Sequence, residues 1–130
     1  VVSTDIDVVV SRPFPELFKP SETMLVTYGM DPGTYPWGVN GGLFAFRPDV
    51  VVYEKVLDIA RSCVTCNDQT VISKLDVPMT VLSHIYNMSP ALCNQPFFGT
   101  NQYEFVKLWH FTYVKKPWHL HTWPDCVQPM

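Results

Sequence analysis

The chain opens with the stretch VVSTDIDVVV, residues 1–10, in which two carboxylates interrupt an apolar run. The apolar flanks predict short buried strands at Val1–Ser3 and Val8–Val10. In an extended strand, residues i and i+2 point to the same face, so Asp5 and Asp7 can hold one divalent cation between them. Alternatively, the tripeptide is a solvated turn or part of a surface ion pair.

Strand and helix signals alternate along the rest of the chain, which predicts an α/β fold with a mixed sheet flanked by helices. Apolar and β-branched runs predict the strands, and i, i+3/i+4 apolar spacing behind a capping aspartate predicts the clearest helix. The expected elements are a helical turn at Pro13–Phe18, strands at Met24–Tyr28 and Gly42–Phe46, a helix at Val50–Ser62 capped by Asp49, a helix at Gln69–Leu75 capped by Asp68, strands at Val81–Leu82 and Phe105–Phe111, a loop opened by Asp31-Pro32-Gly33, and an irregular tail from about Pro117.

Length and composition favour a single partial domain with a real core. The chain has 130 residues, of which 47% are hydrophobic, and a net charge of −3 with scattered lysines and arginines. That balance argues against a nucleic-acid partner, so an anionic ligand would have to be held through a metal. The longest uncharged window, Ile85–Tyr103, is broken by prolines, so no transmembrane segment is expected. Because the chain begins at Val1 inside an expected strand, we expect an internal fragment of a longer protein.

The four cysteines leave several states open. Cys63 and Cys66 have zinc-ligand spacing, but Cys93 and Cys126 do not supply a second compact pair. We therefore expect free thiols, with a disulfide as the next alternative and a structural zinc as the least favoured. Cysteine usage leaves the compartment open between cytoplasm and Golgi lumen. Asn87-Met88-Ser89 also matches a glycosylation sequon, although proline follows it.

Four further positions could carry chemistry. His110 ends an expected strand and is a natural third ligand beside the two aspartates, although a buried histidine is often only hydrogen-bonded. Lys116 could place an ammonium on phosphates, or it could be solvated. Asn40-Gly41-Gly42 would let backbone approach a ligand closely, or simply bend into the strand. Asp68-Gln69 offers hydrogen-bonding groups for sugar hydroxyls, or serves only as a helix cap.

The ordered set of these motifs resembles glycosyltransferase family 8, the glycogenin-like and galactinol-synthase-like enzymes. The resemblance covers about residues 1–118. It is carried by Asp5-Ile6-Asp7-Val8-Val9-Val10, Pro15-Glu16-Leu17-Phe18, Asp31-Pro32-Gly33, Asn40-Gly41-Gly42-Leu43-Phe44-Ala45-Phe46-Arg47-Pro48, Tyr53, Asn67-Asp68-Gln69, Tyr86-Asn87-Met88-Ser89, His110-Phe111 and Lys116-Pro117-Trp118.

The resemblance implies the C-terminal part of a GT-A fold and a retaining transfer from a UDP-sugar to a hydroxyl of a carbohydrate, polyol or protein acceptor. It implies Mn²⁺, with Mg²⁺ as the alternative, and the roles follow position by position. Metal ligands are Asp5, Asp7 and His110; donor-sugar and diphosphate contacts are Asn40, Gly41, Gly42, Asp68, Gln69 and Lys116; and the catalytic candidates are Asp68 and Gln69.

Two features of the chain depart from the family pattern. The family usually has glycine three residues after the metal-binding histidine, where this chain has Tyr113. The half of the fold that holds uracil and ribose would precede Val1. Trp37, Trp118 and Trp123 could stack on an acceptor sugar or could be buried.

Other functions remain open from the sequence. The first alternative is a non-catalytic or truncated family member that acts as a binding or interaction domain. A metal-dependent phosphohydrolase would also use clustered carboxylates and a histidine, but it would usually need more ligands than this chain groups. A purely structural interaction domain explains the composition without explaining the order of the motifs.

Overall fold

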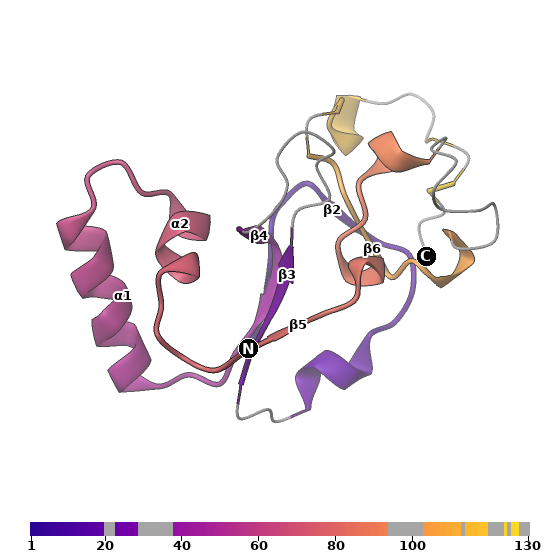
Figure 1. Cartoon of the computed structure of the whole chain (residues 1–130). Helices are drawn as coiled ribbons and strands as arrows, with labels where there is room; N and C mark the ends of the chain where they lie inside the picture. The colour runs from indigo at the N-terminus through magenta and orange to yellow at the C-terminus, as the bar shows by residue number, and fades with distance from the viewer. Residues whose placement is uncertain are drawn as a thin grey trace.

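Six strands and two α-helices form the framework of the residues that the structure, a computed structural model, describes: 1–19, 23–28, 38–93, 103–112, 114–119, 124 and 126–127 (Figure 1). In chain order they are β1 Val2–Thr4, β2 Val8–Val10, β3 Met24–Tyr28, β4 Val39–Ala45, α1 Val50–Ser62, α2 Asp68–Ser73, β5 Met79–Val81 and β6 Leu108–His110. Short 3₁₀ helices connect them: η1 Pro15–Phe18, η2 His84–Tyr86, η3 Pro90–Leu92, η5 Tyr103–Phe105 and η6 Pro117–His119.

The strands divide between two sheets. The larger sheet has the order β1-β4-β3-β5, with β4 antiparallel to both of its neighbours and β3 parallel to β5, so it is a mixed sheet. The smaller sheet pairs β2 with β6 antiparallel, and Val8 lies opposite His110. Because Asp7 immediately precedes β2, this register brings the end of β6 beside the acidic pair.

The core lies around β4 and β6. The two largest fully buried side chains, Trp109 and Phe111, belong to β6 and the residue after it, and both are 0% exposed. Leu43 of β4 packs with Leu17 and Leu108 in a second cluster. Val2 of β1 and Val8 and Val10 of β2 pack against the same cluster, so these apolar contacts join the smaller sheet to the larger one.

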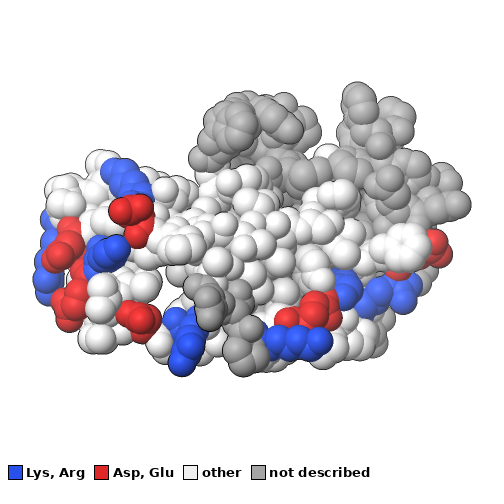
Figure 2. Space-filling view, turned by 60° about the horizontal axis from the view of Figure 1, so that its bottom comes forward, with Lys and Arg blue, Asp and Glu red and all other residues white. Residues whose placement is uncertain are grey.

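The two α-helices lie together to one side of the larger sheet (Figure 1). The predicted helix from Val50 to Ser62 is confirmed, and so is its cap, because Asp49 Oδ1 accepts from Val51 N at 2.7 Å. Its apolar face is only partly covered by α2, and Tyr53 remains 57% exposed. Figure 2 shows acidic and basic side chains interleaved over this part of the molecule.

Several predicted boundaries need correction. The cap of α2 is Asn67, whose Oδ1 accepts from Thr70 N at 2.9 Å, whereas Asp68 is the first helical residue. The strand predicted at Phe105–Phe111 shortens to β6, because Val106 N donates to Tyr103 O and closes a 3₁₀ turn. Smaller shifts affect β1, β4, β5, η1 and the end of α2, which stops at Ser73.

The expectation of free thiols is wrong. Cys63 pairs with Cys66 and Cys93 with Cys126, with Cα atoms 5.4 and 5.9 Å apart respectively. The first disulfide closes the connection between α1 and α2. The second ties the C-terminal tail to the end of η3, and Val127 beside it is buried.

Some predictions fall outside the described residues, namely those on Asp31-Pro32-Gly33, Trp37, Tyr113 and Trp123. Trp118 lies in η6 and is 55% exposed. Within the described part of the chain, the helices are all too short or too polar to pass through a lipid bilayer.

Candidate metal centre

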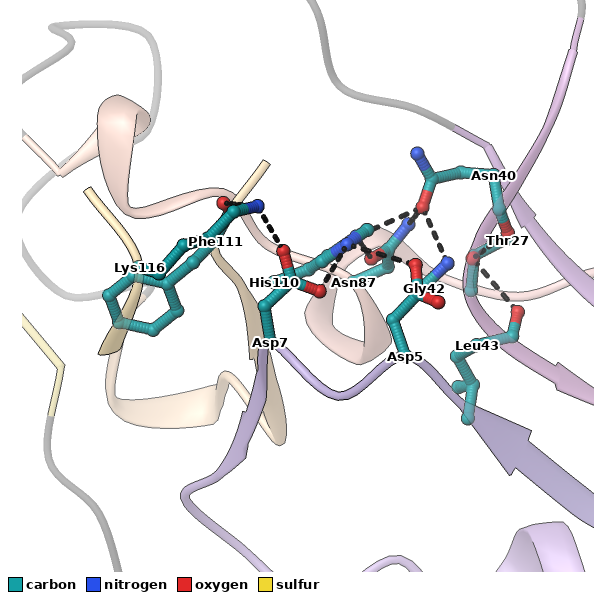
Figure 3. A network of polar contacts seen from close by, with 10 residues as sticks. All are labelled: Asp5, Asp7, Thr27, Asn40, Gly42, Leu43, Asn87, His110, Phe111 and Lys116. Carbon is teal, nitrogen blue, oxygen red and sulfur yellow. Dashed lines mark hydrogen bonds and ion pairs between the residues drawn. The ribbon is translucent and has the colours of Figure 1, made fainter. Parts of the chain in front are cut away.

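Asp5 and Asp7 lie on the connection between the two sheets. They do not continue a strand as the sequence predicts, because Ile6 and Asp7 form a turn between β1 and β2. Ile6 points outward and is 90% exposed, whereas the Asp7 side chain is only 10% exposed. The turn allows the chain to leave the larger sheet and enter the smaller one, and both carboxylates face the end of β6 (Figure 3).

His110 completes this group. Its Nε2 atom lies 3.4 Å from Asp5 Oδ2 and 3.3 Å from Asp7 Oδ1. The three candidate ligand atoms all lie within 4.8 Å of one another. Residues from opposite ends of the described chain therefore converge as a possible metal-binding group. Phe111 N also donates to Asp7 O at 3.0 Å, which fixes the turn against β6.

The opposite edge of the imidazole is held by two amides. His110 Nδ1 lies 3.0 Å from Asn40 Oδ1 and 3.0 Å from Asn87 Oδ1. Asn40 comes from β4 and Asn87 follows η2, so three separate elements meet at this ring. Asn40 Oδ1 also accepts from Gly42 N at 2.8 Å, and Figure 3 shows the Asn40 amide nitrogen pointing away from these contacts.

Lys116 lies at the outer edge of the group. Its ammonium contacts Asp7 Oδ2 and donates to Phe111 O at 3.0 Å. One oxygen of Asp7 therefore faces the imidazole and the other faces the lysine. Lys116, which the resemblance suggests as a diphosphate contact, thus lies beside the acidic pair and places a positive charge there.

The electrostatic surroundings shift the pKa values of the two carboxylates in opposite directions. Burial raises the pKa of Asp5, and the charges of Asp7 and Asp68 add to this, against a lowering by His110. Burial also acts to raise the pKa of Asp7, but the hydrogen bond from Lys116 and the charges of His110 and Lys116 outweigh it, so its pKa is lowered. Burial lowers the pKa of His110, although both aspartates oppose this. A neutral imidazole beside carboxylates is the state that binds a metal.

The candidate donor-sugar residues lie next to this group. Gly41 of β4 packs against the start of α2, where an added Cβ would lie 3.1 Å from Asp68 Oδ2 and 3.5 Å from Gln69 Cγ. A Cβ on Gly42 would overlap His110 and Asn87. Gly42 is therefore needed for close packing within the site, and Gly41 lies against the side chain of Asp68, whose charge contributes to the raised pKa of Asp5.

The donor set fits a divalent cation. Two carboxylates and one imidazole are hard and borderline ligands, which suit Mn²⁺ well and also admit Mg²⁺. The candidate ligand atoms of Asp5, Asp7 and His110 are close enough together to reach one ion. Lys116 pairs with the second oxygen of Asp7, so its charge competes with a bound cation for this carboxylate.

Comparison with protein-family models found no match for this chain, and comparison with curated proteins found none either. The function is therefore inferred from the geometry of the site.

Asn87 is the site residue whose role sequence reasoning missed. In the sequence it stands out only within a glycosylation sequon and as part of one motif of the resemblance. In the structure it is 4% exposed, and both atoms of its amide are engaged, with Asn40 and with His110. Its spacing from the other site residues gives no signal, because only the fold brings η2 beneath the imidazole.

Proposed function

We propose that this chain carries the metal and donor-sugar site of a retaining glycosyltransferase related to family 8. The observation that supports it most is the convergence of Asp5, Asp7 and His110 around one space. The same motifs that suggest the family from the sequence supply these three side chains. The reaction moves a hexosyl or related sugar from a UDP-sugar to a hydroxyl acceptor.

In this proposal Asp5, Asp7 and His110 hold Mn²⁺, or Mg²⁺ in its place. The ion, when bound, neutralises the negative charge that builds on the departing diphosphate. Lys116 assists the same leaving group with its ammonium, which in the structure lies beside Asp7. A basic surface is not required, because the positive charge is concentrated at the centre.

The sugar lies, in this proposal, between β4 and the start of α2. The free amide nitrogen of Asn40 donates to a sugar hydroxyl, and the small volume of Gly41 lets the ring approach the backbone. Asp68 and Gln69 face the anomeric centre and stabilise the positive charge that develops on it. The exposed indole of Trp118, two residues after Lys116, offers a stacking surface for a carbohydrate acceptor.

The disulfides favour one of the two compartments. Structural disulfides persist in oxidising compartments and are rare in the cytosol. We therefore propose an oxidising compartment, for which the Golgi lumen fits better than the cytoplasm. This assignment is independent of the reaction.

The test is a turnover assay on the full-length protein that contains this sequence. UDP-glucose, UDP-galactose and UDP-glucuronic acid are supplied with and without Mn²⁺, and release of UDP is measured. We expect metal-dependent UDP release that Asp68→Asn lowers by roughly 100-fold or more, a typical loss when one charge-stabilising group is removed. Asp58→Asn, on the exposed face of α1, is the matched control and leaves turnover unchanged. A folded protein that releases no UDP from any donor would favour the non-catalytic alternative.

A further inference from the structure

We propose that Asn87 is a positioning residue: its amide oxygen, together with that of Asn40, accepts the proton of His110 Nδ1 and so orients the ring with Nε2 toward Asp5 and Asp7. The inference deepens the proposed function, because it rests on a metal site at these residues. It is carried by a chain of hydrogen bonds whose direction can be read from one backbone group (Figure 3).

The first link is between β4 residues. Gly42 N lies 2.8 Å from Asn40 Oδ1. A backbone N–H can only donate, so the atom it meets must be the amide oxygen of Asn40 and not its nitrogen. The orientation of the Asn40 amide is therefore set by the backbone.

The second hydrogen bond fixes the orientation of the Asn87 amide. The Asn87 amide lies 2.9 Å from Asn40 Oδ1, which is an acceptor. Only the nitrogen of Asn87 can donate to it, so Asn87 Nδ2 must face Asn40. The oxygen of Asn87 must then face the other way, toward the ring of His110.

The third link determines the imidazole. His110 Nδ1 lies 3.0 Å from Asn87 Oδ1 and 3.0 Å from Asn40 Oδ1, and both of these oxygens are acceptors. An imidazole nitrogen with an electron pair would be repelled by both, so Nδ1 carries the proton. The other ring nitrogen, Nε2, lies 3.4 Å from Asp5 Oδ2 and 3.3 Å from Asp7 Oδ1, so the ring is oriented with Nε2 as its candidate metal ligand.

The burial of these groups prevents water from replacing the contact. Asn87 is 4% exposed and His110 is 5% exposed. A buried ring nitrogen keeps the hydrogen-bond partner that the protein supplies, because an unpaired polar group costs free energy there. Gly42 contributes by its lack of a side chain, since a Cβ would overlap both Asn87 and the ring.

The tautomer is measured directly by NMR on the metal-free, ¹⁵N-labelled chain at about pH 8, where an ordinary imidazole is neutral. Long-range ¹H–¹⁵N correlations distinguish a protonated from an unprotonated ring nitrogen. The chain has four histidines, so His110→Gln assigns the signal. We expect a protonated Nδ1 in the wild-type chain.

Two variants test the role of Asn87. Asn87→Leu removes one of the two acceptors of the Nδ1 proton and the amide that donates to Asn40 Oδ1, and we expect a smaller population of the Nδ1-protonated ring and a roughly 10- to 100-fold loss of Mn²⁺ affinity in calorimetry. Asn87→Gln keeps both an amide oxygen to face Nδ1 and an amide nitrogen to donate to Asn40, so it should retain the proton on Nδ1. A folded Asn87→Leu with an unchanged tautomer overturns the inference. If Asn87→Leu does not fold, an unprotonated Nδ1 in the wild type or in Asn87→Gln overturns it.

The same experiment separates this inference from the proposed function. A wild-type chain that has the expected tautomer, lost in Asn87→Leu, but binds no Mn²⁺ supports the positioning role and contradicts the metal site. If the wild-type chain and Asn87→Leu bind Mn²⁺ equally well and Nδ1 is protonated in both, the positioning role alone is contradicted.

Discussion

The ammonium of Lys116 lies against Asp7 Oδ2, although 109 positions separate the two residues in the sequence. The pair forms where the end of β6 meets the turn between β1 and β2, and Lys116 also donates to Phe111 O. A fixed positive charge thus stands at the edge of the candidate metal centre. It lowers the pKa of Asp7 against the effect of burial, and it also competes with any cation for the same carboxylate.

Removal of this charge should affect metal binding and turnover in opposite directions. Lys116→Ala leaves a more negative site, so Mn²⁺ affinity should rise roughly tenfold at low salt, since a nearby unit charge is worth about 1–4 kcal/mol near a protein surface. UDP release should fall, because the leaving group loses its ammonium. Calorimetry and the turnover assay measure the two effects. Lys115→Ala, an exposed neighbour, is the control and should change neither. A weaker Mn²⁺ affinity in Lys116→Ala would contradict this account.

The two glycines on either side of Asn40 should differ in their tolerance of a methyl group. Gly42→Ala places a Cβ into His110 and Asn87, whereas Gly38→Ala meets nothing within 4 Å. Overpacking a filled site typically costs about 1–3 kcal/mol. We expect that loss of unfolding free energy, together with loss of Mn²⁺ binding, for Gly42→Ala only. Urea unfolding measures it, and equal stability of the two variants would show that the packing is looser than described.

Acid stability should depend on Glu16. Hydrogen bonds from Lys107 and then from Tyr86 lower the pKa of Glu16 from 4.5 to about 2. The folded chain therefore keeps this carboxylate ionised at a pH where the unfolded chain has taken up the proton. Its contribution is fully present above 4.5 and is lost as pH falls from 4.5 toward 2. The side chain is 36% exposed, so screening by solvent reduces the effect.

Urea midpoints measured from pH 6 down to about pH 2 check this dependence. Glu16→Gln should be less stable than the wild type near neutral pH and should lose less stability across the acid range. Glu54→Gln, on the exposed surface of α1, is the control. Parallel pH profiles for Glu16→Gln and the wild type would refute the role of the Glu16–Lys107 pair.

The two disulfides should contribute unequally to stability. Cys93 and Cys126 are 33 positions apart, whereas Cys63 and Cys66 are 3 apart. On the chain-entropy account, the longer loop contributes about 4 kcal/mol and the shorter one about 2 kcal/mol. Replacing each pair by serines and measuring thermal unfolding tests the order. A larger loss from the Cys63–Cys66 pair would contradict it.

Local signals in the sequence predicted the elements whose own residues determine them. The helix from Val50 to Ser62 has both an apolar periodicity and a capping aspartate, and β2 and β3 have β-branched runs between turn residues. The cap of α2 was ambiguous, because Asn67 and Asp68 are adjacent and either can accept from the first turn. The backbone decides it: Asn67 is extended, with φ −84° and ψ 176°, while Asp68 is already helical.

Contacts between residues that are far apart in the sequence are less predictable. The three candidate metal ligands were named from residue type and order, and the structure brings them together. From the sequence, the turn at Asp7 is only an alternative to an extended strand, since the pairing of β2 with β6 in a separate sheet leaves no local signal. Cysteine pairing was missed for the same reason, because spacing alone does not reveal which sulfurs meet. Asn87 shows the limit most clearly, because its function depends on contacts with β4 and β6.

The most direct test is the binding of Mn²⁺ to this chain, measured by calorimetry and by electron paramagnetic resonance. We predict one ion per chain, with affinity reduced at least tenfold in Asp7→Asn, which removes a charged ligand. Asp58→Asn, which removes a carboxylate from the exposed surface of α1, should bind as the wild type does. Equal Mn²⁺ affinity in the wild type and in Asp7→Asn would contradict the metal centre, and with it the proposed glycosyltransferase.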